Sequence, residues 1–89
     1  MLIQPPTVII ANARFSTGDP VRPWVTALAL RDEALAAMGS AAEILKLADP
    51  ATRLVDAGGR TIVLPQRLTA GDLVRVVFTS DSDFALVFS

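Results

Sequence analysis

The chain contains no histidine and no cysteine among its 89 residues. Imidazole and thiolate groups hold most protein-bound zinc, and histidine is the usual proton carrier near neutral pH. The chain therefore cannot by itself be a hydrolase that depends on histidine or on a histidine-bound metal. Without cysteine there is no disulfide to support the fold, and cysteine usage does not indicate a redox compartment.

Clustered positive charge is also missing. The net charge is −1, and the eight basic residues are spread over the chain. They are Arg14, Arg22, Arg31, Lys46, Arg53, Arg60, Arg67 and Arg75. A surface that tracks phosphates needs such residues side by side, so we do not expect nucleic-acid binding.

Long apolar runs are absent as well. Every uninterrupted apolar run is far shorter than the roughly 20 residues that a spanning helix needs. Residues 1–6 have neither the positive start nor the apolar stretch of a signal peptide. These features predict a cytoplasmic protein with no membrane contact.

Apolar residues are nevertheless plentiful. They make up 52% of the chain, and the mean hydropathy is +0.49. A domain this small buries only about 60–65% of the surface of its unfolded chain. Either a dense core of valine, leucine and alanine accommodates the surplus, or a second copy or another protein covers it. The second explanation predicts a dimer or another protein partner.

Short β-branched segments separated by turn residues predict a mainly β fold in a single domain, residues 1–89. The expected strands are residues 7–11, 13–16, 24–31, 34–38, 52–56, 60–64, 73–79 and 84–89. Turn residues lie between them, notably Asn12, Asp32-Glu33 and Gly58-Gly59. We interpret the strands as antiparallel hairpins that form a small composite β-sandwich or open barrel.

One short helix is expected at about residues 41–48. Ser40 and Glu43 have the spacing of a capping box, in which each side chain bonds the backbone N–H of the other residue. Asp49-Pro50 ends the helix, because proline disfavours helical geometry in the residue before it.

Seven pieces of the chain follow one another in a known order. They are residues 8–14, 17–20, 23–24, 37–40, 42–44, 55–60 and 63–65. This order resembles the N-terminal β segment of the amidohydrolase superfamily, and most closely the subgroup called amidohydrolase 3. The resemblance covers residues 7–65. It implies half of a composite β domain from a family of metal-dependent hydrolases, many of which act on C–N bonds.

The chain departs from the family where its metal-binding barrel would begin. Gln66 replaces the usual glycine, and no His-X-His motif follows. No metal ligand of the family can be carried over, so no catalytic, cofactor-binding or metal-binding residue is predicted. Residues 68–74 resemble the segment that returns from the barrel. The resemblance thus implies a linker at 66–72 in place of the barrel and a C-terminal hairpin at 73–89. It requires residues 73–79 to pair within the sheet system of residues 7–11.

A second departure lies in the turn at Asp32-Glu33, where the family often has glycine. If this turn keeps a positive φ, Glu33 carries a steric cost that glycine would avoid.

A few side chains could take part in catalysis or ligand binding, but each also has a simpler structural explanation. Asp81 and Asp83 flank Ser82, and such carboxylates can move protons or hold a hard cation. This pattern between two strands is normally a solvated turn. Trp24 can stack on a ligand, although a single tryptophan at a strand start more often packs within the fold.

The resulting functional hypothesis is a non-catalytic, barrel-less β domain that acts in self-association or protein interaction. Phe78, Phe84 and Phe88 can belong to its core or to such an interface. The alternative is a fragment or relative of a metal-dependent hydrolase, with the barrel missing or supplied by another chain. A functionless remnant is also compatible with the sequence.

Overall fold

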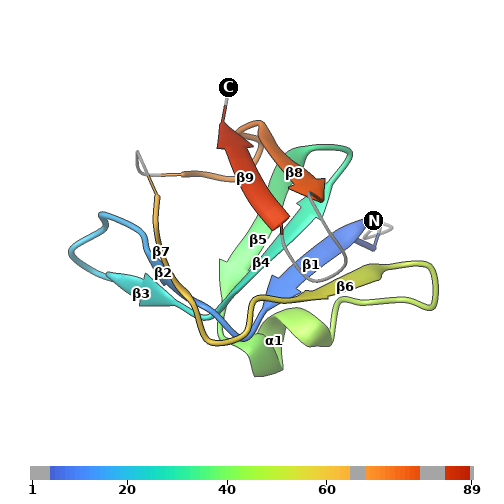
Figure 1. The fold of residues 1–89 in the computed structure, drawn as a ribbon, viewed down its shortest axis with the longest axis horizontal. Coiled ribbons are helices and arrows are strands. Elements are labelled where there is room, and N and C mark those ends of the chain that lie inside the picture. Colours follow the sequence, from blue (N-terminus) through green and yellow to red (C-terminus); the bar gives the residue numbers. More distant parts are fainter. Residues whose placement is uncertain (1–4, 65–67, 79–83, 89) are drawn as a thin grey trace.

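The computed structural model describes residues 5–64, 68–78 and 84–88, which form a mainly β domain with one short helix (Figure 1). The elements are β1 (Val8–Ala11), β2 (Arg14–Ser16), β3 (Trp24–Val25), β4 (Ala27–Arg31), β5 (Ala34–Gly39), α1 (Ala41–Leu45), β6 (Arg53–Asp56), β7 (Thr61–Val63), β8 (Val74–Phe78) and β9 (Phe84–Phe88). Sheet A has the strand order β5-β4-β1-β6, sheet B has β3-β2-β7, and β8 pairs with β9. Sheets A and B are not closed into a barrel within the described residues, and the predicted fold class is confirmed.

The chain passes from sheet A to sheet B by the same route twice. β1 leads to β2 through Asn12, and β6 leads to β7 through Gly58 and Gly59, all with positive φ. β6 lies parallel to β1, and β7 lies parallel to β2. The prediction of antiparallel hairpins at these two places is therefore wrong. Each turn is a corner between sheets, and the Gly59 N–H bonds the Asn12 carbonyl at 2.7 Å across the two corners.

The hairpin between β4 and β5 is confirmed. Arg31 pairs with Ala34, so Asp32 and Glu33 form a two-residue turn. Their φ angles are 50° and 69°, and two positive values define a type I′ turn. Glu33 therefore carries the expected steric cost of a left-handed backbone.

The predicted strand at 24–31 is divided at Thr26. β3 joins sheet B, whereas β4 joins sheet A. The Thr26 N–H donates to the Gly39 carbonyl at 3.0 Å, and the Thr26 hydroxyl accepts from the Ala41 N–H at 2.8 Å. These bonds fix the change of direction.

Two apolar clusters stabilise the fold. The larger lies between sheet A on one side and sheet B with β8 on the other, and it contains Ile10, Phe15, Leu28, Leu35, Leu68 and Val74 among others. The smaller lies under α1 and consists of Ile9, Ala27, Ala29 and Ile44. Because both faces of sheet A are covered along β4, residues 27–30 are all buried. Alternation along residues 24–31 predicts a strand with one buried face, and this prediction is wrong at residues 27–30.

Helix α1 is shorter than predicted. The Ser40 hydroxyl accepts from the Glu43 N–H at 3.3 Å and lies 3.0 Å from its carboxylate, so the serine half of the capping box is confirmed. After Leu45 the N–H groups of Leu47 and Ala48 bond carbonyls three residues back, which tightens the turn and ends the α-helix. No helix in residues 5–64, 68–78 and 84–88 is long and apolar enough to cross a membrane.

The C-terminal strands form a sheet of their own. β8 and β9 pair antiparallel from Val74 opposite Phe88 to Phe78 opposite Phe84. One isolated bridge, from Leu73 to Ala34 of β5, links this segment to sheet A. The pairing with the sheet of residues 7–11 that the family resemblance requires thus amounts to one bridge and not a ladder. The side chains of Phe78, Phe84 and Phe88, whose role the sequence left open, lie outside what the structure describes.

Candidate functional site

The two edge strands of sheet A, β5 and β6, differ in whether other described segments bond their outer backbone groups. At the β5 edge, the Leu35 N–H donates to the Asp72 carbonyl at 2.7 Å, and the Leu35 carbonyl accepts from the Gly71 N–H at 2.8 Å. The Val74 N–H donates to the Glu33 carbonyl at 2.6 Å. We call β5 with residues 71–74 the closed edge, because residues 71–74 bond the outward backbone groups of Glu33 and Leu35 at the start of this strand.

The opposite side of the molecule has an open edge, which we define as β6 and β7. β6 is the last strand of sheet A, and β7 is the last strand of sheet B. No strand of the described part of the chain pairs with their outer side. Leu54 on β6 is 62% exposed and Val63 on β7 is 72% exposed. Two large apolar side chains therefore lie on consecutive edge strands.

The backbone of β6 shows which groups point outward. The N–H groups of Arg53 and Ala57 donate to carbonyls at the ends of β1, each at 2.9 Å. In a parallel ladder alternate residues bond the same neighbour, so Leu54 and Asp56 direct their backbone groups away from β1. Leu54 thus combines an exposed apolar side chain with outward donor and acceptor groups.

The same alternation applies to β7. The Arg60 carbonyl accepts from the Arg14 N–H at 2.9 Å, and the Leu64 N–H donates to the Ser16 carbonyl at 3.1 Å. Val63 lies between these inward-bonded positions, and its backbone groups point outward. The open edge has the backbone requirements of a strand that can accept another strand.

A side-chain clamp fastens β6 to β1. The Asn12 amide donates to the Asp56 carboxylate at 2.8 Å, and the Gly58 N–H donates to the same oxygen at 2.7 Å. These two hydrogen bonds hold the pKa of Asp56 below its ordinary value, and the bond from Gly58 has a larger effect than the bond from Asn12. The clamp holds β6 beside β1 and does not involve the outward backbone groups of Leu54.

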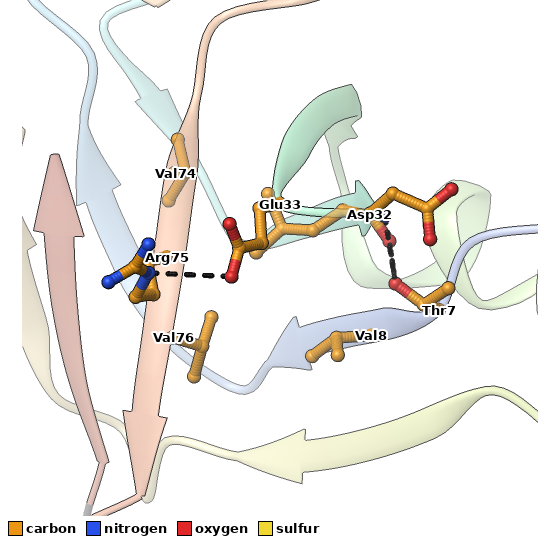
Figure 2. A pocket seen from close by; sticks show the side chains of 8 residues that line it. Thr7, Val8, Asp32, Glu33, Val74, Arg75 and Val76 are labelled. Carbon is orange, nitrogen blue, oxygen red and sulfur yellow. Dashed lines mark hydrogen bonds and ion pairs between the residues drawn. The ribbon is translucent and has the colours of Figure 1, made fainter. Parts of the chain in front are cut away.

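A shallow groove lies beside the closed edge (Figure 2). It is lined by Thr7, Val8, Leu30, Asp32, Glu33, Val74, Arg75 and Val76. The Glu33 carboxylate lies 3.4 Å from the Arg75 guanidinium, and the Asp32 N–H donates to the Thr7 hydroxyl at 3.3 Å. With a volume of about 200 Å³, the groove is smaller than the roughly 300 Å³ at which ligand pockets begin. Several of its polar groups already bond one another, which is what a seam between strands requires.

Trp24 lies at the surface and not in the core. Its side chain is 45% exposed, on the face of sheet B that it shares with Ser16. The Arg14 guanidinium stacks on the ring at 4.7 Å from its centre. The expected packing role holds only in this form, as a cation–π contact on an outer face.

The acidic candidates do not assemble into a reactive group. The Asp72 carboxylate accepts from the Thr69 N–H at 2.8 Å and so closes its own turn. The Glu43 carboxylate accepts from the Ser40 hydroxyl at 3.0 Å and lies 3.7 Å from the Arg22 guanidinium. Asp81, Ser82 and Asp83 lie outside the described residues. Within the described ranges, no three acidic side chains lie close enough together to hold a metal ion.

The open edge is the feature that sequence reasoning missed. The prediction joined residues 52–56 and 60–64 into a hairpin, in which each strand would satisfy the other. The parallel pairings with β1 and β2 depend on residues more than 40 positions away in the sequence. The local sequence does not mark this edge, because Val63 stands between Ile62 and Leu64, and Leu54 stands between Arg53 and Val55.

Comparisons with known proteins support the fold but assign no activity. No protein-family model matches the chain, and no curated protein is significantly similar to it. A Bacillus thuringiensis protein, BT9727_2919, whose crystal structure was determined as a structural-genomics target, is similar over 73% of this chain and 86% of its own, with 28% identity and a TM-score of 0.62. Its description names no substrate or partner. The resemblance to amidohydrolases is not tested by these comparisons and stays a prediction.

Proposed function

We propose that this chain is a non-catalytic β domain that self-associates through its open edge. The observation that carries the proposal is the coincidence of outward backbone groups and exposed apolar side chains on β6 and β7, with Leu54 62% and Val63 72% exposed. A strand edge of this kind pairs with another strand unless charge, proline or a covering segment prevents it.

The remainder of the molecule is compatible with this role. The net charge of −1 creates little repulsion between copies. The apolar share of 52% is high for so small a domain, and part of it lies on the open edge. Association would remove Leu54 from water, and burying a complete leucine side chain contributes about 1.5–3 kcal/mol.

The first test is the solution mass, measured by light scattering during size-exclusion chromatography over a dilution series. We expect the mass of the natural chain to rise above that of one 9.4 kDa chain as its concentration increases. Leu54→Lys should remain at the mass of one chain, because a charged side chain opposes pairing at that edge. Leu45→Lys is the matched control, since Leu45 is 42% exposed on α1, whose main contacts are with β4, β5 and β1 and not with β6 or β7.

Two results would overturn the proposal. One is a natural chain that stays at the mass of one chain at every concentration, which would turn the search toward a different protein as partner. The other is a Leu54→Lys variant that associates as well as the natural chain and the Leu45→Lys control.

A further inference from the structure

We infer that the self-association ends at a two-fold symmetric dimer in which β6 pairs antiparallel with β6 of a second copy, with Leu54 facing Leu54 across the axis. This inference rests on the proposed function and specifies the strand, the symmetry and the register. It follows from the closed edge, from the outward groups of β6, and from the charges at its two ends.

The closed edge opposes head-to-tail growth through sheet A. A chain of copies joined in that way would need β6 of one copy to reach β5 of the next. The backbone groups of Leu35 are already bonded to Gly71 and Asp72. Pairing of β6 with the start of β5 would have to displace these bonds, so a contact made by sheet A alone is favoured with β6 on both sides, which makes it symmetric and self-limiting.

Symmetry restricts the register. A two-fold axis between antiparallel edge strands lies perpendicular to the sheet, so matching faces of the two copies adjoin. Residues directly opposite each other then point to the same face. Within the four-residue strand Arg53–Asp56 the axis can pass beside any one of the four residues, each of which would face its own copy.

Charge excludes two of the four registers. An axis beside Arg53 places two guanidinium groups opposite each other, and an axis beside Asp56 does the same with two carboxylates. Like charges directly opposite on neighbouring strands are destabilising. The Asp56 carboxylate is further held in place by Asn12 and Gly58, so it cannot easily turn away.

Apolar contact separates the remaining two registers. With the axis beside Val55, Leu54 lies opposite Asp56 of the second copy and keeps a charged neighbour. With the axis beside Leu54, two side chains that are each 62% exposed cover one another, and Arg53 lies opposite Val55. The outward backbone groups of Leu54 then exchange two hydrogen bonds with those of its copy.

The dimer is expected to be weak. A four-residue strand edge covers less than the roughly 1,000 Å² typical of stable interfaces. The measured mass should rise with concentration to a plateau at two chains. Val63→Lys should leave this plateau in place, because β7 takes no part. Loss of association in Val63→Lys, or a mass of the natural chain well beyond two chains, would overturn the symmetric β6 dimer. Neither result would contradict self-association of the natural chain through its open edge.

Disulfide trapping tests the register, because the natural chain has no cysteine. The single variants Arg53→Cys, Leu54→Cys, Val55→Cys and Asp56→Cys each report one of the four registers. In the inferred register the Cα atoms of residue 54 in the two copies lie about 5.5 Å apart, within the roughly 4.4–6.8 Å that a disulfide spans. With oxidised glutathione as oxidant, Leu54→Cys should form covalent dimers roughly tenfold faster than the other three.

The outcomes separate the two proposals. Fastest cross-linking at residue 54 supports the register, and fastest cross-linking at residue 53, 55 or 56 overturns it while self-association stands. No cross-linking at any position in a chain that light scattering shows to associate overturns pairing through β6. Leu54→Cys changes an exposed side chain, so its circular dichroism should match that of the natural chain and loss of fold should not obscure the result.

Discussion

Leucine occupies both edges of sheet A, in opposite surroundings. Leu35 on β5 is 3% exposed, and its backbone bonds the segment at residues 71–74. Leu54 on β6 is 62% exposed, and its backbone groups point away from β1. Residues 71–74 thus protect the start of one edge, and no other strand of the described residues pairs with the outer side of the other edge.

Under the proposed function, the two edges of this 89-residue domain have different roles, the closed edge in stability and the open edge in association. The closed edge contributes to the main core, because Leu35 and Val74 both belong to that core. At the open edge Val55 and Ile62 also pack against this core, whereas Leu54 and Val63 remain exposed. A change at Leu35 should therefore alter folding, and a change at Leu54 should alter association.

The largest expected effect comes from the same substitution made at the two edges. Leu35→Ala leaves a cavity in the main core and should lower the free energy of unfolding by about 2–5 kcal/mol. Leu54→Ala removes a mostly exposed side chain and should change it by less than about 0.5 kcal/mol. Urea denaturation followed by circular dichroism measures both, at a concentration low enough for single chains to predominate.

Equal losses in the two variants would remove the distinction between the edges. A large loss in Leu54→Ala alone would mean that the bare edge is covered within the single chain. Dilution supplies the control, because a loss that reflects association disappears as the concentration falls.

The sequence predicts most of the individual strands but little of how they pair. β1, β5 and the presence of a turn at Asp32-Glu33 follow from local pattern, since hairpin pairing joins neighbours in the sequence, whereas the type I′ geometry of that turn does not. The serine cap of α1 follows in the same way. Each of these features depends on residues that lie only a few positions apart.

The parallel pairs could not be predicted, because their partners lie far apart in the sequence. Val8 pairs with Arg53 and Arg14 with Thr61. Gly58-Gly59 permits a reversal or a corner equally well, and only the second set of strands decides between them. The open edge is a product of this choice, so the candidate site could not be predicted before the topology was known.

A smaller effect is expected at the turn of the closed edge. Glu33 has a φ of 69°, which costs an L-residue about 1–2 kcal/mol, whereas glycine adopts it freely. Glycine loses more backbone entropy than glutamate on folding, which offsets part of this relief. Glu33→Gly should therefore raise the free energy of unfolding by about 0.5–1 kcal/mol. Thermal or urea denaturation measures the gain.

A matched variant separates backbone strain from the ion pair with Arg75. Glu33→Ala removes the carboxylate that lies 3.4 Å from Arg75 but keeps the Cβ atom. Exposed ion pairs contribute about 0–1 kcal/mol, so Glu33→Ala should be no more stable than the natural chain. If Glu33→Ala raises the free energy of unfolding as much as Glu33→Gly does, relief of backbone strain is not the cause of the increase.

The smallest effect concerns the clamp that holds the inner side of the open edge. Hydrogen bonds from Gly58 and Asn12 lower the pKa of Asp56 in the folded chain. Between the folded-state pKa and the ordinary value near 3.9, the unfolded chain binds more protons than the folded chain. The stabilisation from this carboxylate is therefore complete above the ordinary value and is lost as the pH falls through the folded-state pKa.

A variant that cannot ionise at this position tests the effect. The difference in unfolding free energy between the natural chain and Asp56→Asn should shrink from about pH 6 to about pH 3. Asn12→Ala should reduce the pH-dependent part of that difference, because one cause of the lowered pKa is gone. If the difference stays constant over this range, the Asp56 carboxylate does not favour the folded chain over the unfolded one, and β6 is held to β1 by its backbone ladder alone.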